Sequence, residues 1–199
     1  MNLNTISNLF AVRLCGKLNL DENLIPVYAY GLELLLAAII NILLIFFVAL
    51  FFRVPYAGVS FLLAFIPLRV TAGGYHAGTH FRCTTVCLVT FVLTIILAFY
   101  IHDIYRPIAG MVFCLFNLVT VICLSPVQAA EKPLNVGERH INRRRSIFLA
   151  ILFCAVSVLS LNRQFSSAIL FFSFGVFSAA ISQIAGKIQS IAEGRYTHE

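Results

Sequence analysis

The sequence predicts an all-α, polytopic helical integral membrane protein with about six transmembrane segments and an N-terminal amphipathic interfacial helix. Of its 199 residues, 60% are hydrophobic and 11% are charged, whereas soluble domains carry ~25% charged residues. A single domain of this length leaves too much of its surface in water to hide such an apolar excess. The basic residues also lie between apolar blocks. This composition excludes a soluble enzyme, a nucleic-acid-binding module and a disordered chain.

The N-terminal segment, residues 1–24, has helical periodicity. Its large apolar residues recur at steps of three and four: Leu3, Ile6, Phe10, Leu14 and Leu18. This spacing predicts an amphipathic helix on the membrane surface, or a leader helix packed on the rest of the protein. The segment has no uninterrupted apolar core of the kind a signal peptide needs, so we expect it to be retained.

Six apolar blocks follow and make up the predicted spans. They cover residues 27–52, 54–68, 84–101, 108–124, 146–161 and 165–184. A helical span needs ~20 residues, with a lower limit of ~17. The second and fifth blocks are short by this measure, and Pro67 makes the second block a candidate half-helix that enters the membrane and returns.

Basic residues are distributed unevenly between the two sides that six spans would create. One side carries only Arg53, Arg106 and Arg163, and the other side carries the remaining eleven Lys and Arg residues. Because cytoplasmic loops carry the excess of Lys and Arg, the richer side is predicted to be cytoplasmic. Both termini and the long loops 69–83 and 125–145 would then lie in the cytoplasm.

The loop 69–83 carries the strongest chemical signal, with three glycines, two histidines and a cysteine at a membrane boundary. Cys83 is predicted in the first turn of the next helix, where the helix dipole favours the thiolate that attacks carbonyl carbon. His76 is the candidate proton acceptor and donor. Gly73 and Gly74 allow backbone conformations that could direct an N–H group at a developing oxyanion.

Two other interpretations fit the same loop. His76 and His80 are four residues apart, and Cys83 could complete a zinc site in a transporter or metalloenzyme. No Asp or Glu lies in the loop, however, and the glycines argue against a regular helix through His76. A structural or channel subunit would leave this cluster without a role.

Several of these residues also resemble a family signature. Arg69, the run Gly-Gly-Tyr-His-Ala at 73–77 and Cys83 are similar to the signature of the accessory gene regulator B (AgrB) family, membrane cysteine peptidases of bacterial peptide quorum sensing. The chain length, the helix pattern and the later Ser-Pro-Val at 125–127 and Glu-Lys-Pro at 131–133 are similar as well. The likeness therefore covers nearly the whole chain.

The resemblance implies one membrane peptidase domain over residues 1–199, in the cell membrane of a bacterium. It implies that Cys83 and His76 are catalytic, that Arg69, Gly73 and Gly74 support them, and that no metal or cofactor is needed. The expected substrate is a small precursor peptide of the AgrD type with an acidic tail. Cleavage of its C-terminal part through an acyl-enzyme thioester would release or cyclise an autoinducing peptide.

The loop 125–145 has two interpretations. Its basic residues are Lys132, Arg139, Arg143, Arg144 and Arg145. They are either a topology signal or a binding surface for the acidic peptide tail or for anionic lipid. Some members of the family have a lysine cluster before the proline, where this chain has Ala-Glu-Lys-Pro at 130–133. Membrane lipids are the other expected partners, a homodimer stays open, and nucleic acid is not expected.

Overall fold

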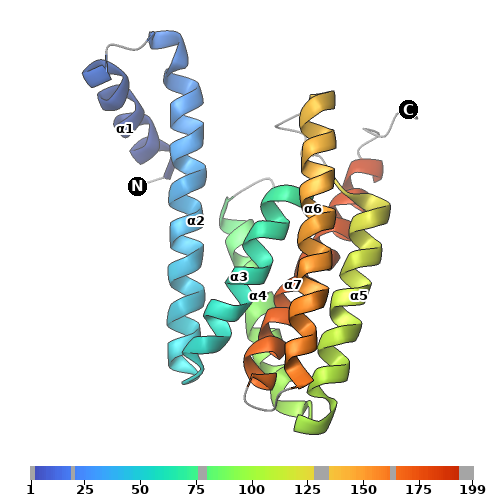
Figure 1. Ribbon diagram of the computed structural model, residues 1–199. Coiled ribbons are helices and arrows are strands. Elements are labelled where there is room, and N and C mark those ends of the chain that lie inside the picture. Colours follow the sequence, from blue (N-terminus) through green and yellow to red (C-terminus); the bar gives the residue numbers. More distant parts are fainter. Residues whose placement is uncertain (1–2, 19–20, 76–79, 128–134, 162–164, 193–199) are drawn as a thin grey trace.

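A computed structural model of the chain describes residues 3–18, 21–75, 80–127, 135–161 and 165–192. This part of the chain is helical and contains no named β-strand (Figure 1). Its α-helices are α1 (Leu3–Leu18), α2 (Ile25–Phe51), α3 (Pro55–Ala72), α4 (His80–Tyr100), α5 (Arg106–Leu124), α6 (Val136–Ser157) and α7 (Ser166–Ala192). Short 3-10 turns precede α2 and α5, and a third, η3 (Val158–Leu161), extends α6. The predicted all-α fold is confirmed.

Local sequence signals explain where several helices begin. Proline stands in the first turn of α2, α3 and α5, where its missing N–H costs no helical hydrogen bond. Asn135 and Glu138 form a reciprocal capping box at the start of α6. Pro67 lies inside α3 without ending it, so the second apolar block forms one continuous helix.

Helix α7 is the central element of the bundle. In its most apolar stretch 61% of the residues are buried, against 11% in α2. One apolar cluster joins α7 to α2, α3 and α4 around Phe61 and Phe91. A second cluster joins α7 to α3, α5 and α6 around Leu68 and Val121. The α3 and α7 backbones approach closely at Gly175, where a Cβ atom would lie 2.5 Å from the Phe61 carbonyl oxygen.

The outer surface of the bundle is apolar, as expected for a protein in lipid. Large side chains such as Phe47, Phe51 and Phe99 are exposed. Five helical segments are long and apolar enough to cross a membrane: Ile25–Phe51, Pro55–Ala72, Arg82–Tyr100, Asp103–Leu124 and Ser166–Ala192. These segments confirm a polytopic membrane protein.

The fifth predicted span, residues 146–161, is not among these five segments. It forms the second half of α6 together with η3, and the first half of α6 carries Arg139, Arg143, Arg144 and Arg145. Because the helix continues through the basic run, residues 136–145 are helical and do not form a loop.

The N-terminal helix α1 packs on the first half of α2 (Figure 1). Its small residues Ser7, Ala11 and Cys15 are buried, whereas the larger Phe10 and Leu18 are exposed. The small face allows close packing between helices, and the apolar face is left for lipid. The structure thus shows the packed leader helix, and a position at the membrane surface stays a prediction.

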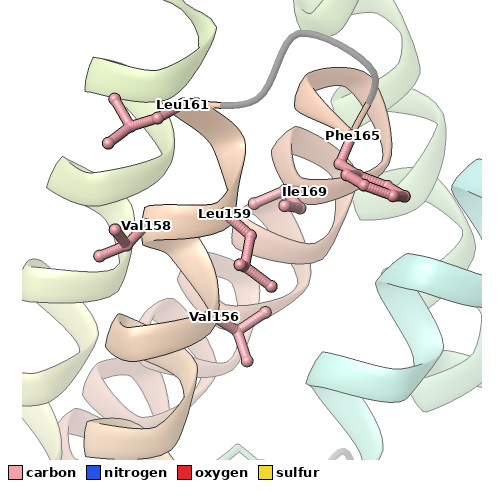
Figure 2. Close-up of a pocket in the computed structure, with 6 residues that line it drawn as sticks. All are labelled: Val156, Val158, Leu159, Leu161, Phe165 and Ile169. Carbon is pink, nitrogen blue, oxygen red and sulfur yellow. The ribbon is translucent and has the colours of Figure 1, made fainter.

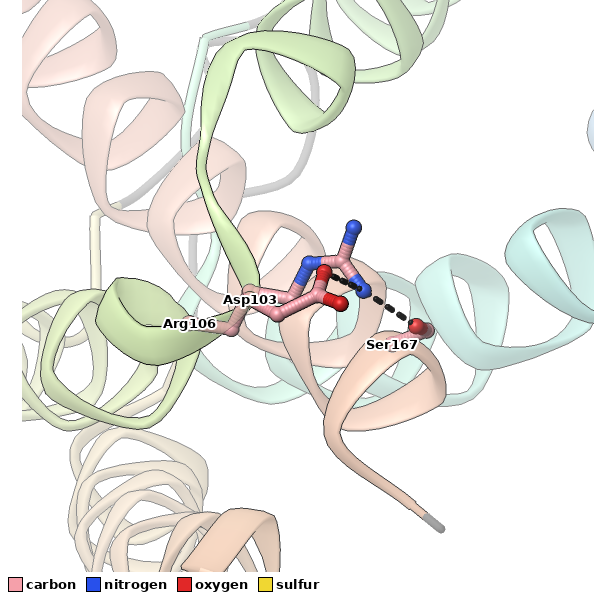
Figure 3. Close-up of polar contacts among 3 residues, drawn as sticks. All are labelled: Asp103, Arg106 and Ser167. Atoms are coloured by element: carbon pink, nitrogen blue, oxygen red, sulfur yellow. Dashed lines mark hydrogen bonds and ion pairs between the residues drawn. The ribbon is translucent and has the colours of Figure 1, made fainter. Parts of the chain in front are cut away.

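Helices α5 and α7 run side by side in the same direction. Near their first residues, Arg106 Nη1 donates to Ser167 Oγ at 2.7 Å and pairs with Asp103 Oδ1 at 2.8 Å (Figure 3). Further along, Asn117 Nδ2 donates to the Val176 carbonyl at 3.2 Å. The loop after α3 and the far ends of α5 and α7 consequently meet at the opposite end of the bundle.

This arrangement gives a labelling experiment that tests the predicted orientation. In a cysteine-free variant, Tyr105→Cys should react with a membrane-impermeant thiol reagent in intact cells, because Tyr105 is exposed at the end that carries few basic residues. Gly137→Cys, at the start of the basic helix α6, should react only after the membrane is permeabilised. Leu161→Cys should label like Tyr105→Cys if α6 and η3 cross the membrane. The reverse pattern at Tyr105 and Gly137 would invert the orientation.

Candidate functional site

The segment that follows α3 is tied to the end of α5. Gly73 ends α3 with φ of 75° and Gly74 follows with φ of 142°, backbone conformations that other residues rarely adopt. The Val127 N–H donates to the Ala72 carbonyl at 2.9 Å, and Gly73 forms an isolated parallel bridge with Val127. A Cβ atom on Gly73 would lie 2.0 Å from the Val127 carbonyl oxygen. Only glycine allows this approach.

The same segment is also held by α7. The Tyr75 N–H donates to the Ser182 carbonyl at 2.7 Å. One helical turn later, a Cβ atom on Gly186 would lie 2.5 Å from the Gly74 carbonyl carbon and 2.6 Å from the Tyr75 nitrogen. The absence of a side chain at Gly186 therefore gives the loop a place to lie against α7.

Arg69, in the last turn of α3, links the segment after α3 to helix α7. Its Nη1 donates to Ser182 Oγ at 3.0 Å, and its Nη2 donates to the Tyr75 carbonyl. The guanidinium also interacts electrostatically with the thiols of Cys83 and Cys87. A positive charge that is costly to place near the membrane interior is thus hydrogen-bonded and lies near two thiols.

The candidate nucleophile, Cys83, lies in the first turn of α4, is partly buried and is not in a disulfide. The first turn of a helix has unpaired N–H groups and the positive end of the helix dipole. Cys87 lies one turn deeper and is 8% exposed, and the Asn41 carboxamide of α2 approaches its sulfur.

The structure shortens the loop predicted at 69–83. Residues through Ala72 belong to α3, and residues from His80 onward belong to α4, because both helices extend into the polar segment. Gly73 and Gly74 allow close packing on Val127 and α7, and the neighbouring Tyr75 N–H is already taken by the Ser182 carbonyl.

Some predicted site residues cannot be placed beside this cluster. His76 and Lys132 lie outside the described residues. Arg139, Arg143, Arg144 and Arg145 are exposed along α6. Arg139 lies close enough to Lys187 of α7 for the two charges to interact. These four arginines, which we call the basic surface, lie at the same end of the bundle as the Cys83 and Cys87 thiols.

Three contacts of the cluster were not predicted from the sequence. Ser182 and Gly186 come from α7, more than a hundred residues after Arg69, and Asn41 comes from α2. No spacing rule links residues so far apart. A serine four residues before a glycine on an apolar helix is a signal of close packing, but it does not identify the partner.

One apolar pocket has no part in this chemistry. It measures about 470 Å³ and lies where α6, η3 and the start of α7 meet (Figure 2). Its lining is entirely apolar: Val156, Val158, Leu159, Leu161, Phe165 and Ile169. Such a cavity provides no nucleophile, acid or base, and it lies at the end of the bundle remote from Cys83.

Glycine substitutions test whether the loop depends on these approaches. Gly73→Ala and Gly186→Ala should each destabilise the protein, because an added Cβ meets backbone atoms at 2.0 Å and 2.5 Å and strain of this kind costs ~1–3 kcal/mol. The measurement is thermal unfolding in detergent together with protease sensitivity of the α3–α4 connection. Gly137→Ala is the control, since a Cβ atom there has no neighbour within 4 Å. Equal behaviour of all three variants would contradict the described packing.

Comparisons with known proteins point to one family. The family model described as accessory gene regulator B matches residues 7–186. AgrB-like protein 2 of Clostridium perfringens (strain 13 / Type A) is 23% identical over 174 residues, which cover 83% of this chain and 80% of that protein. No solved structure matches the chain. Because the family model matches most of the chain, Arg69 and Cys83 included, the chain belongs to the accessory gene regulator B (AgrB) family of membrane proteins.

Proposed function

We propose that this AgrB-family protein is a cysteine endopeptidase that removes the C-terminal part of a small AgrD-type precursor and releases or cyclises an autoinducing peptide. The observation that carries the proposal is the Arg69 guanidinium beside the Cys83 thiol, at a helix N-terminus. A thiol in this electropositive and partly buried setting has the environment of reactive cysteines in general. Family membership supports a role in peptide quorum sensing.

The chemistry follows from the properties of a thiolate. Cys83 Sγ attacks the carbonyl carbon of the scissile peptide bond and forms a tetrahedral oxyanion. Its collapse breaks the C–N bond, and the amine of the C-terminal fragment leaves with a proton that His76 is proposed to supply after taking it from the thiol. The N-terminal fragment remains bound to Cys83 as a thioester.

The fate of this thioester decides the product. Attack by water releases a linear peptide, and attack by a cysteine thiol of the same fragment exchanges one thioester for another and closes a thiolactone ring. Thioester exchange is nearly isoergic, whereas a thioester made from an amide lies uphill. Limited access of water to a partly buried Cys83 favours exchange over hydrolysis.

The basic surface on α6 supports an acidic substrate tail. Arg139, Arg143, Arg144 and Arg145 are exposed, and a row of exposed positive charges attracts an acidic peptide or anionic lipid. In the proposed orientation this surface, Cys83 and both termini face the cytoplasm of a bacterial cell. A newly made precursor would then meet the basic surface and the nucleophile on one side of the membrane.

The nucleophile assignment predicts different outcomes for two neighbouring thiols. Cys83→Ala should abolish cleavage of a coexpressed, epitope-tagged precursor, while the protein still accumulates in the membrane, because the change removes the attacking atom and little packing. Cys87→Ala is the matched control and should retain most of the activity, since this thiol is buried one turn deeper. Processing by the Cys83→Ala variant would overturn the assignment.

The role of His76 gives a second comparison, between two histidines. His76→Ala should lower the cleavage rate by about 10²–10⁴-fold, the usual contribution of a general acid or base, while His80→Ala should be much less affected. Elemental analysis of the purified protein accompanies the assay. Equal losses in both variants, with zinc bound to the wild type and activity removed by a strong chelator, would favour a metal site instead.

A further inference from the structure

Ser182 of α7 accepts two hydrogen bonds from the region at the end of α3, one through its backbone carbonyl and one through its side-chain hydroxyl. Its carbonyl accepts the Tyr75 N–H at 2.7 Å, and its hydroxyl accepts Arg69 Nη1 at 3.0 Å. The first contact uses the backbone and is open to any residue. The second contact needs a side-chain acceptor at this position, so of these two contacts only the one with Arg69 depends on the identity of residue 182.

A neighbouring serine shows that this arrangement is specific to residue 182. Ser178 lies one turn earlier on α7 and is buried, but its hydroxyl donates to the Phe174 carbonyl of the same helix at 2.7 Å. This is the usual way in which a serine satisfies its hydroxyl in an apolar helix. Ser182 instead uses its oxygen as an acceptor for a cation from α3.

Two hydrogen bonds fix the Arg69 guanidinium at two corners of its plane. Nη1 is held by Ser182 and Nη2 by the Tyr75 carbonyl. A planar fork held at both ends keeps one orientation, whereas a fork held at one end retains the rotamer freedom of a long side chain. The hydroxyl of Ser182 therefore determines how steadily the charge faces the thiols.

We propose that Ser182 is a positioning residue: it fixes the Arg69 guanidinium and thereby keeps a positive charge beside the Cys83 thiol when that thiol loses its proton. The inference rests on the proposed function in that Cys83 is the nucleophile. Among the residues that the structure describes, the titratable groups that interact with the guanidinium are the Cys83 and Cys87 thiols of α4. From α7 it meets the uncharged Ser182 hydroxyl, and α2 contributes the uncharged Asn41 beside Cys87.

Alkylation of Cys83 by iodoacetamide tests this proposal without any peptide substrate. The full-length protein is alkylated in detergent from acidic to alkaline pH, and modification of Cys83 is followed by peptide mass spectrometry. Because the thiolate is the reacting form, Ser182→Ala should move the rate profile to higher pH. Loss of one hydrogen bond predicts alkylation about three- to tenfold slower near neutral pH, with an unchanged plateau at high pH. Ser178→Ala should match the wild type.

A double-variant comparison shows whether the effect passes through Arg69. Arg69→Gln should displace the profile further than Ser182→Ala, and adding Ser182→Ala to Arg69→Gln should change nothing more, because the group being positioned is already gone. Ser182→Thr keeps the hydroxyl and should remain near the wild-type profile. If Ser182→Ala does not accumulate, Ser182→Cys keeps the side-chain volume with a weaker acceptor and replaces it in the comparison.

Two results would overturn the proposal. One is a Ser182→Ala profile identical to that of Ser178→Ala, and the other is an additive displacement in the Arg69→Gln background. Failure of the peptidase assignment gives a different result, since it appears as precursor cleavage by Cys83→Ala and leaves the alkylation profiles unchanged.

Discussion

The pair of hydrogen bonds made by the Arg69 guanidinium is the interaction on which the rest of the candidate site depends. It joins the last turn of α3, the carbonyl of Tyr75 and the Ser182 hydroxyl of α7, and it holds a positive charge near the thiols of α4. An unpaired guanidinium at this depth would be costly. The cost is offset because the same contacts hold the loop in place, so binding of the charge and ordering of the loop support each other.

Close packing on α7 makes this interaction geometrically possible. Gly175 brings α7 against the α3 backbone, and Gly186 leaves room for the backbone of Gly74 and Tyr75. Between these two glycines, Ser182 faces the end of α3. The burial of α7 therefore has two consequences. Its side chains take part in both apolar clusters, and its position fixes where Ser182 contacts Arg69 and the backbone of Tyr75.

The sequence was sufficient for the fold class and for the place of Cys83 in the first turn of its helix, because apolar periodicity and helix-start signals are local. The family was identified from the resemblance of residues 69–83 and 125–133 to a family signature. The sequence was not sufficient for the limits of the two polar loops, since Arg69 and His80 lie in helices that only tertiary packing extends so far. The roles of Ser182 and Asn41 were missed for a related reason: each meets its partner from another helix. The fifth apolar block, residues 146–161, was also misjudged from the sequence. It belongs to a longer helix whose first half carries the basic run 139–145, and this helix is not among the five segments that are apolar enough to cross a membrane.

The central claim, that Cys83 carries an acyl group during peptide cleavage, is tested most directly by the mass of the enzyme itself. Purified protein is mixed with an AgrD-type precursor, quenched in acid and analysed intact and after digestion. The account predicts an adduct equal to the N-terminal fragment less one water, located on Cys83 and removed by hydroxylamine, as expected for a thioester. Cleavage at full rate with no adduct on Cys83, or with the adduct on another cysteine, would contradict it.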